Sequence, residues 1–427
     1  MKKIFSDYGD KVDSIVQKHM NIIVEETKKI VPDVVSILAV GGLGRGEGSF
    51  LLEKNGIMPL NDYDVYIITK KKIPFDLLKK VSENSSKRIY QKYNFSFEKS
   101  SSLMEFYTDL RNMTLRELSK VEPMIKYYEI RESAKIIYGK DVRKQMPNFS
   151  LEDIPLSDGL RFLMNRMSLL IESFNENPNS FDIKKTMLYY IGKNYLSCAE
   201  ALLLLNKKFE CSYKKRASIL KQCFKEDFPE LSKKVPKLVA KVNQYTNNKL
   251  RPSKKFFNKD PLKEWLEAKE IMYEVAQFYI HHAFGINVNK DILSENIQKL
   301  KNIFMKEYME IYIKSKYRIK APKIMLSFLS RLGKMYMNFL YFKRENLLNK
   351  KYNFKILFSL GDINLRIYSI CSLVLFSLDS NMKIDAEIFN KAIKEIKKIK
   401  KIKKIKAFKE LSKEYSDLFR IYQFLKS

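Results

Sequence analysis

Two aspartates separated by a single residue stand in an apolar stretch of the N-terminal region. Asp62 and Asp64 flank Tyr63, and Val65 and Ile67 continue the run. Because successive side chains of a strand alternate between its faces, we expect both aspartates on one face and the apolar residues on the other. Paired carboxylates hold Mg²⁺, a hard cation that proteins usually bind through one or two carboxylates plus substrate phosphates. The pattern predicts in-line attack on a nucleoside triphosphate, with Mg²⁺ as the cofactor.

A glycine-rich turn precedes the two aspartates. Residues 34–40 are apolar and rich in β-branched side chains, which predicts a buried strand that ends at a glycine pair. Glycine lets backbone N–H groups approach phosphate oxygens closely, so we expect the triphosphate on this turn, with the arginine near its terminal phosphates. The candidate nucleotide-binding residues are Gly41, Gly42, Gly44, Arg45 and Ser49.

These residues resemble the signature of the nucleotidyltransferase superfamily that includes DNA polymerase beta. That signature is a hydrophobic residue, Gly, Gly or Ser, a spacer, and Asp-x-Asp/Glu on a strand; here it reads Val40-Gly41-Gly42 and then Asp62-Tyr63-Asp64. The strings GGLGRGEGS and NDYDVYII are similar to those of uncharacterised bacterial and archaeal members. The spacer is longer than is common in the superfamily, and its extra residues predict a small hairpin that turns at Asn55-Gly56.

The resemblance implies a third acid on a neighbouring strand, where it binds a second metal ion or draws the proton from the attacking hydroxyl. Residues 102–110 are the candidate strand, and Glu105 and Asp109 share one of its faces. Glu105 is our first choice as a catalytic and metal-binding residue beside Asp62 and Asp64, Asp109 is the second and Glu98 the third. The alternative for Glu105 is an exposed strand residue without a catalytic role.

The length of 427 residues predicts two or three domains. The order of the N-terminal elements, together with the resemblance, predicts an α+β fold: a small mixed-sheet nucleotidyltransferase domain followed by a large all-helical region. We expect a catalytic domain over residues 1–145, a helical domain over 146–300 and a C-terminal helical, lysine-rich domain over 301–427.

Basic residues of the helical region are candidates for contact with the triphosphate. Arg166, Lys185 and Lys193 reach it if the helices pack over the active site; otherwise they form a solvated helix face. The interval 248–261 is rich in Pro and Lys and predicts a loop with an exposed basic surface. Near the C-terminus every third residue from 393 to 405 is isoleucine and lysines fill most of the gaps. This repeat predicts a lysine-coated surface helix, with binding of a phosphate backbone as the alternative.

The composition favours an anionic partner. The chain has 80 Lys plus Arg against 49 Asp plus Glu, a net charge of +31. A field of this sign favours RNA, DNA or nucleotide, although lysine spread along the whole chain is also typical of organisms with A/T-rich genomes. Four cysteines without CxxC spacing and three histidines argue against zinc. The longest apolar run, residues 367–378, is too short to cross a membrane, so we expect a cytoplasmic protein without a membrane partner.

The acceptor is the open question. Members of the superfamily transfer a nucleoside monophosphate to a hydroxyl or phosphate of RNA 3′ ends, proteins, antibiotics or other nucleotides. The positive charge favours RNA, including tRNA as in toxin-like enzymes; transfer to a small molecule or a protein is the alternative. A noncatalytic RNA-binding or scaffold protein on the same fold is a third reading, which the intact Asp62 and Asp64 disfavour.

Overall fold

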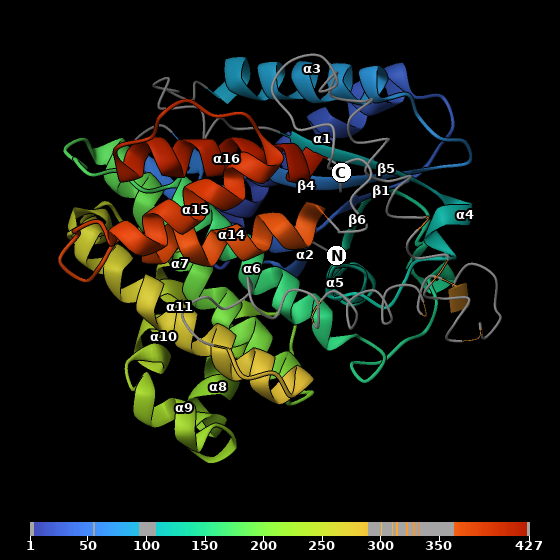
Figure 1. Cartoon of the computed structure of the whole chain (residues 1–427). Helices are drawn as coiled ribbons and strands as arrows, with labels where there is room; N and C mark the ends of the chain where they lie inside the picture. Colours follow the sequence, from blue (N-terminus) through green and yellow to red (C-terminus); the bar gives the residue numbers. More distant parts are fainter. Residues whose placement is uncertain are drawn as a thin grey trace.

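The computed structural model (Figure 1) describes residues 4–53, 56–93, 108–288 and 363–424. Between these ranges it also describes Leu300, Glu310, Ile313, Lys314, Pro322, Phe328 and Leu332. The described chain combines a small mixed sheet with many helices, which confirms the predicted α+β class.

The N-terminal region is built on a four-stranded sheet with the order β5-β4-β1-β6. Its strands are β1 (Val34–Ala39), β4 (Tyr63–Thr69), β5 (Thr108–Thr114) and β6 (Lys135–Gly139). β1 runs antiparallel to both β4 and β6, whereas β4 and β5 are parallel. The buried, β-branched composition of β1 and β4 places these two strands at the centre of the sheet.

The two faces of the sheet have separate hydrophobic cores. Helices α1 (Asp10–Ile30) and α3 (Phe75–Tyr93) cover one face and contact each other (Figure 1). Tyr63, Val65 and Ile67 of β4 enter this core, whereas Tyr66 and Ile68 enter the opposite core with α5 (Ile125–Ser133). The alternation along β4 confirms the predicted strand and puts Asp64 on the α5 side.

The extra residues of the spacer form the predicted hairpin. β2 (Phe50–Glu53) pairs antiparallel with β3 (Gly56–Pro59), and Glu53 stands opposite Gly56. The glycine-rich stretch before it is a single helical turn, α2 (Gly41–Arg45), that ends at Gly46 in the left-handed conformation. The described part of the strand predicted over 102–110 is a strand, β5, which continues beyond the predicted end to Thr114. Residues 94–107, and Glu105 among them, lie outside the described residues.

The helical region packs around α7 (Phe181–Leu205), which is buried along most of its length. It contacts α6, α8, α10 and α11, and α14 and α16 pack on α6, so that residues from α6 to α16 share one hydrophobic core. Trp265 donates a hydrogen bond from its indole N–H to the carbonyl of Leu170, 2.9 Å away. The other helices are α6 (Leu156–Glu172), α8 (Tyr213–Asp227), α9 (Pro229–Lys234), α10 (Leu238–Leu250), α11 (Pro261–Phe284), α14 (Ile363–Phe376), α15 (Ala386–Ile399) and α16 (Phe408–Phe424). Shorter turns are α4 (Leu115–Leu118), η1 (Arg143–Gln145) and η2 (Lys254–Asn258).

The C-terminal isoleucine repeat differs from the prediction. The helix ends at Ile399, and residues 401–406 continue without helical structure. A period of three drifts around an α-helix, but it stays on one side of an extended chain with three residues per turn. The domain limits at 145 and 300 stay predictions. No helix in the described ranges is long and apolar enough to cross a membrane.

Gly139, the last residue of β6, offers a test of this arrangement. Its φ is +81°, and a Cβ there would lie 2.1 Å from the carbonyl oxygen of Val35 on β1. Gly139→Ala combines left-handed strain with a clash against backbone, so we expect a loss of about 3 kcal/mol in the free energy of unfolding. Urea denaturation of the full chain measures it. Gly285→Ala is the control, because Gly285 has φ +66° with nothing within 4 Å and should lose only about 1 kcal/mol. Equal losses in the two variants would contradict the packing described here.

Candidate active site

The two aspartates stand where β4 begins, directly against α2. The Val40 N–H donates to the Asp64 carbonyl at 3.0 Å, which fixes the start of α2 against the strand. Gly41 has a φ of +58°, and a Cβ at this position would lie 2.8 Å from Oδ2 of Asp64. Gly41 is therefore required twice, by its backbone conformation and by the closeness of the carboxylate. Asp62, at the residue before β4, is exposed.

Asp64 has an unfavourable electrostatic environment. Burial, followed by the negative charge of Asp109, raises the pKa of Asp64 to about 6, although Arg111, Lys193 and Arg45 oppose the shift. Asp109 is the residue of β5 that pairs with Asp64 in the parallel register, so the two side chains share a face. The Arg111 guanidinium donates to Asp109 at 2.9 Å. Of the three candidates for the third acid, the structure therefore places Asp109 beside Asp64, and Glu98 and Glu105 lie outside the described residues.

A small pocket opens beside the carboxylates. It is lined by Gly42, Ser49, Asp62, Asp64 and Lys249, among others. The Ser49 side-chain oxygen is buried and, in the part of the chain that the structure describes, has no hydrogen-bond partner. A buried hydroxyl without a partner is costly unless a ligand or water completes it. Of the expected nucleotide-binding residues, Gly42 and Ser49 thus line the pocket. Gly41 packs closely against the Asp64 carboxylate.

The helical region contributes positive charge to the same place. Lys249, at the end of α10, donates to Oδ1 of Asn61 at 2.7 Å and lines the pocket. Its pKa is held well below the ordinary value, mainly by burial and then by Lys193 and Arg45. Burial and Arg166 lower the pKa of Lys193 to about 8, while Asp62 and Asp64 act in the opposite direction. Several cations therefore crowd together opposite the aspartates.

Two of the three basic residues expected from the helical region lie near the aspartates. Arg166 of α6 donates from Nε to the Ser197 hydroxyl at 3.3 Å and acts electrostatically on Lys193. Lys185 instead pairs with Asp182 at 2.7 Å on its own helix. Sequence reasoning missed Lys249, which it assigned to an exposed basic loop. The last turn of an amphipathic helix was the available signal, because such a turn carries both buried and exposed positions.

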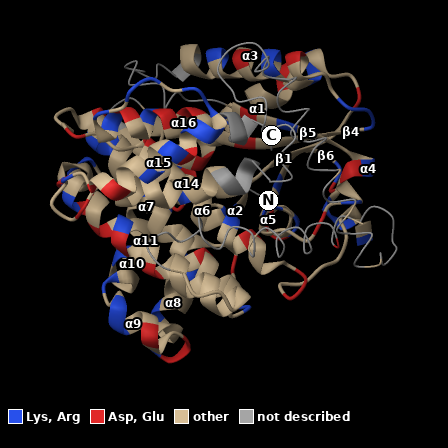
Figure 2. Ribbon diagram, viewed as in Figure 1, with Lys and Arg blue, Asp and Glu red and all other residues tan. Residues whose placement is uncertain are grey.

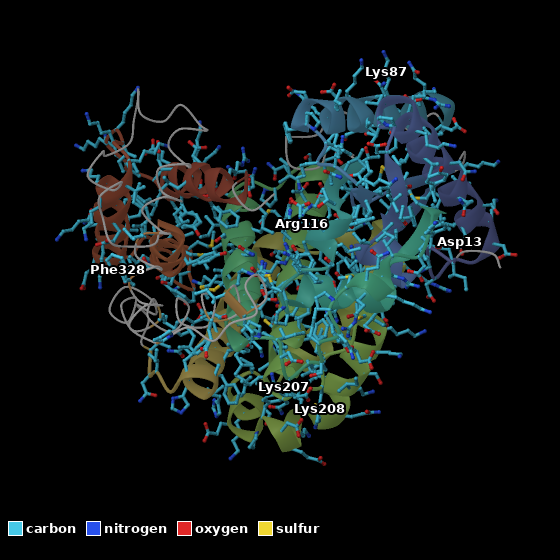
Figure 3. The ribbon with its side chains drawn as sticks, turned by 90° about the vertical axis from the view of Figure 1, so that its right-hand side faces the viewer. Asp13, Lys87, Arg116, Lys207, Lys208 and Phe328 are labelled. Atoms are coloured by element: carbon cyan, nitrogen blue, oxygen red, sulfur yellow. The ribbon has the colours of Figure 1, made fainter. Side chains whose placement is uncertain are left out.

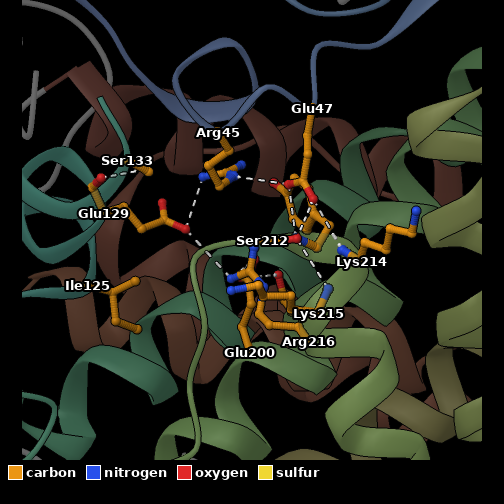
Figure 4. A network of polar contacts seen from close by, with 12 residues as sticks. Arg45, Glu47, Ile125, Glu129, Ser133, Glu200, Ser212, Lys214, Lys215 and Arg216 are labelled. Atoms are coloured by element: carbon orange, nitrogen blue, oxygen red, sulfur yellow. Dashed lines mark hydrogen bonds and ion pairs between the residues drawn. The ribbon is translucent and has the colours of Figure 1, made fainter. Parts of the chain in front are cut away.

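Arg45 has a different position from the one expected. Its side chain is 4% exposed and lies in a buried network instead of facing the pocket (Figure 4). Nη1 is 3.0 Å from Glu129, Nε is 3.4 Å from Glu47, and the guanidinium lies 4.5 Å from the centre of the Tyr213 ring. Burial opposes the charge, but these partners hold the pKa of Arg45 above its ordinary value. A guanidinium buried between two carboxylates and a ring positions the loop and does not reach a phosphate in the pocket.

Gly44 has a structural place as well. A Cβ on Gly44 would lie 2.9 Å from the Ala39 carbonyl and 3.2 Å from the Ser133 carbonyl, so its lack of a side chain lets α2 pack closely against β1 and α5. The Lys135 ammonium donates to the carbonyls of Leu43 and Gly44, which neutralises the carbonyl end of α2.

Glu47 is a second residue that sequence reasoning missed. Its carboxylate accepts hydrogen bonds from the first residues of α8: the Ser212 hydroxyl at 2.7 Å, the Tyr213 N–H at 2.9 Å and the Lys214 N–H at 3.2 Å. Free N–H groups at a helix start favour a carboxylate, so this contact joins the glycine-rich loop to the helical region. The string GRGEG held no signal for this role, because the partner helix is remote in sequence.

The oxygen donors at the pocket suit Mg²⁺. Within the described ranges, no group of three or more His, Cys, Asp or Glu side chains is arranged to hold a metal ion. Mg²⁺ does not need such a cage, since one or two carboxylates and substrate phosphates complete its shell. Asp62 and Asp64 meet that requirement. The repulsion between Asp64 and Asp109 is also one that a bound cation relieves. The residues present therefore fit the ion.

The fold of the chain is similar to those of some solved structures. No protein-family model matches the chain, and no curated protein matches it. Among solved structures, the chain is similar to spectinomycin adenyltransferase from Enterococcus faecialis, determined with ATP and spectinomycin. The identity is 12%, the match covers 60% of this chain and 98% of that one, and the TM-score is 0.37. At this score the similarity decides nothing about the reaction, which must be argued from the site.

The raised pKa of Asp64 predicts that Asp64→Asn stabilises the protein. Folding disfavours the charged form, so the carboxylate costs stability in full above about pH 6 and progressively less as the pH falls towards about 4. We expect Asp64→Asn to raise Tm at about pH 7.5 and to lose most of that gain at about pH 4.5. Thermal denaturation at the two pH values measures this difference. Asp76→Asn, on the exposed start of α3, is the control and should show no such pH-dependent gain. A pH-independent effect of Asp64→Asn would contradict the described environment.

Proposed function

We propose that the protein is a Mg²⁺-dependent nucleotidyltransferase that moves a nucleoside monophosphate from a nucleoside triphosphate to an acceptor. The observation that carries this proposal is the meeting of two kinds of group at one pocket. Asp62 and Asp64 provide metal-binding oxygens, and Gly42, Ser49 and Lys249 provide donors for phosphate beside them. Carboxylates and phosphate donors in the same small space suit a metal-bound polyphosphate better than either ligand alone.

The chain's own residues position the triphosphate. The Ser49 hydroxyl and the backbone around Gly42 donate to phosphate oxygens, and Lys249, Lys193 and Arg166 neutralise the charge from the side of the helical region. Phosphoryl and nucleotidyl transfer need little covalent chemistry from the protein, so most of the acceleration comes from positioning and charge stabilisation. Arg45 and Glu47 do not contact the triphosphate; they position the loop that carries Ser49.

Asp62 and Asp64 would hold the Mg²⁺ ion. When bound, the ion supplies charge neutralisation at the phosphates and draws electrons from the reacting phosphorus. In the reaction the acceptor oxygen attacks the α-phosphorus, the bond from that phosphorus to the bridging oxygen breaks, and pyrophosphate leaves. Asp109, next to Asp64, accepts the proton of the acceptor hydroxyl. Glu105 is the alternative for this role.

RNA, tRNA included, is the acceptor that the charge favours. The net charge of +31 attracts a polyanion, whereas a small neutral or cationic acceptor needs no such field. The nucleotide itself, ATP or another, has no selecting feature among the described residues of the pocket. A small-molecule or protein acceptor is an outcome of the assay below.

Removal of either carboxylate should abolish transfer. Purified protein is incubated with each of the four α-labelled nucleoside triphosphates, Mg²⁺ and total RNA, and then with lysate as a source of other acceptors. We expect label in RNA from the unmodified protein, and less than about one thousandth of that rate from Asp62→Asn or Asp64→Asn. Chelation of the metal should have the same effect. Unchanged transfer by both variants would contradict the assigned site, and absence of transfer to any acceptor would overturn the proposed reaction.

Lys249, which lines the pocket, and Lys193, which interacts electrostatically with Asp62 and Asp64, should determine affinity for the triphosphate. We expect Lys249→Met and Lys193→Met each to raise the KM for the nucleoside triphosphate about tenfold, because about 1.4 kcal/mol of phosphate attraction is lost. Lys185→Met is the matched control: it lies on the same helix as Lys193, but its ammonium is paired with Asp182. Steady-state kinetics with varied triphosphate separates the three variants. A similar KM in all three would argue against the helical region as part of the nucleotide site.

A further inference from the structure

The segment that follows α15 has a burial pattern with a period of three. Ile399 is buried and Ile402 and Ile405 are half-buried, and all three pack with the core of the helical region. Apart from Lys400, the lysines between and after them are exposed. We call these residues the lysine track: Lys401, Lys403, Lys404 and Lys406. In an extended chain with three residues per turn, lysines three positions apart recur on one side about every 9 Å.

The charge of the lysine track has no internal compensation. Residues 396–409 contain no Asp or Glu, and in the part of the chain that the structure describes none of the four track ammonium groups forms an ion pair. Lys406 contacts Glu410 only through its backbone N–H, at 2.7 Å. Lys400 differs from the track lysines, because it is buried and lies 2.7 Å from Glu414 and 3.3 Å from Asp417 of α16. Figure 2 shows the connection between α15 and α16 mostly in the blue of Lys and Arg. Lys400 therefore fastens the segment, and the other lysines face solvent.

Contacts link the lysine track to the candidate active site. Lys400 pairs with Asp417, one turn before Arg420 on α16, and Arg420 forms an ion pair with Glu172 at the end of α6. The next link is α7, which packs along α6. On α7 the Tyr190 ring lies 5.3 Å from the Tyr189 ring, and the Lys249 ammonium, which lines the pocket with Asp62 and Asp64, lies 5.5 Å from the centre of the Tyr189 ring. Packed side chains and ion pairs therefore connect the segment held by Lys400 to the pocket of the two aspartates.

The chemistry of the track fits a phosphodiester backbone. Lysine ammonium groups are point charges that bind phosphates without reading bases, and a linear spacing suits a repeating anion better than a single small one. A membrane surface fits less well, because an interfacial segment needs an apolar face towards the lipid. Here the isoleucines that could supply such a face pack into the protein core.

We infer that the lysine track binds the sugar-phosphate backbone of a single-stranded RNA acceptor and guides it towards Asp62 and Asp64. The role of the carboxylates in this inference rests on the proposed nucleotidyl transfer, whereas RNA binding by the track does not. The contacts are independent of base sequence, so the protein accepts many RNA sequences at this surface.

The test compares two variants of the full chain with equal charge change. The track variant replaces the four lysines by glutamine: K401Q, K403Q, K404Q and K406Q. The control variant removes four exposed lysines around α1 and α3, which lack ion-pair partners among the described residues: K11Q, K71Q, K80Q and K87Q. In Figure 3, Lys87 projects outward on the side of the molecule opposite to the C-terminal helices. Circular dichroism melting establishes that both variants are folded.

Fluorescence anisotropy with a labelled single-stranded RNA of about 16 nucleotides gives Kd at several salt concentrations. We expect the track variant to bind at least about tenfold more weakly than the control, with a salt slope that is smaller by about 3, or about 0.7 for each lost phosphate contact. Equal slopes and affinities in the two variants would overturn the inference. Tight binding of the unmodified chain to phosphatidylserine vesicles, without binding to RNA, would overturn it as well.

Transfer assays with the same two variants separate this inference from the proposed function. Loss of label in RNA by the track variant, with an unchanged KM for the triphosphate, supports guidance by the track. Weak RNA binding by the track variant, in a protein whose unmodified form transfers no nucleotide to any acceptor, removes the proposed reaction and retains the track as an RNA-binding surface.

Discussion

A buried carboxylate at the junction of the sheet region and the helical region determines the geometry of the site. Glu47 follows the glycine-rich turn in the chain, yet its oxygens accept three hydrogen bonds from the start of α8. The opposite exchange also occurs: Asp158 of α6 accepts a hydrogen bond from the Ile125 N–H, at the start of α5, at 2.8 Å. Each region thus provides a carboxylate that accepts hydrogen bonds from N–H groups at the start of a helix in the other region. Within the described part of its own region, α5 has no side-chain cap, and Ser212 caps only the Lys215 N–H of α8. The remaining N–H groups depend on the other region, which favours one arrangement of the two.

Ion pairs around Glu47 exclude other arrangements of the two regions, but they add little to the stability of the observed one. Arg45 and Arg216 share Glu129, at 3.0 and 3.6 Å, and Arg216 also lies 2.9 Å from Glu200. Removing charges from water costs about as much as such pairs regain, but leaving one partner alone costs about 3 to 5 kcal/mol. A shifted docking of α8 would leave several of these charges unpaired. The network therefore excludes alternative placements, and with them other positions of Lys193 and Lys249 relative to the aspartates.

Local patterns in the sequence were enough to predict the parts of the site that lie on one element. The alternation along β4 that places Asp64, the strand before Gly41 and the hairpin in the spacer all depend on neighbours in the chain. The partner of Asp64 could not be predicted this way, because Asp109 reaches it only through the pairing of β4 with β5. Register between strands is decided by packing across the sheet, which a single sequence does not encode locally.

The two residues that were misplaced illustrate the same limit from opposite directions. Arg45 stands in a loop that resembles a phosphate-binding turn, but its buried acid Glu129 and its ring partner Tyr213 come from distant elements. Lys249 lies at the start of a basic interval that looks exposed, and only the packing of α10 against α7 carries it to the pocket. In both cases the residue type indicated a role for a positive charge, but the neighbouring residues in the sequence did not indicate where that charge lies in the fold. The role of a charged residue depends on which opposite charge the tertiary structure places beside it, and the sequence alone does not show that partner.

In the proposed reaction, binding of the metal ion and binding of the triphosphate should have opposite effects on protonation: the first releases protons and the second takes them up. Asp64 is harder to ionise than usual because it is buried beside Asp109, and Lys193 is harder to protonate because it is buried beside Arg166. A divalent cation at the aspartates favours the ionised carboxylate, so its binding releases protons near pH 6. A triphosphate at the lysines favours the ammonium form, so its binding takes up protons near pH 8. Between these two values both groups carry the charge that their ligand needs. Like charges that repel within the folded protein are therefore relieved when metal and triphosphate bind together, which favours their binding as one complex over the binding of either alone.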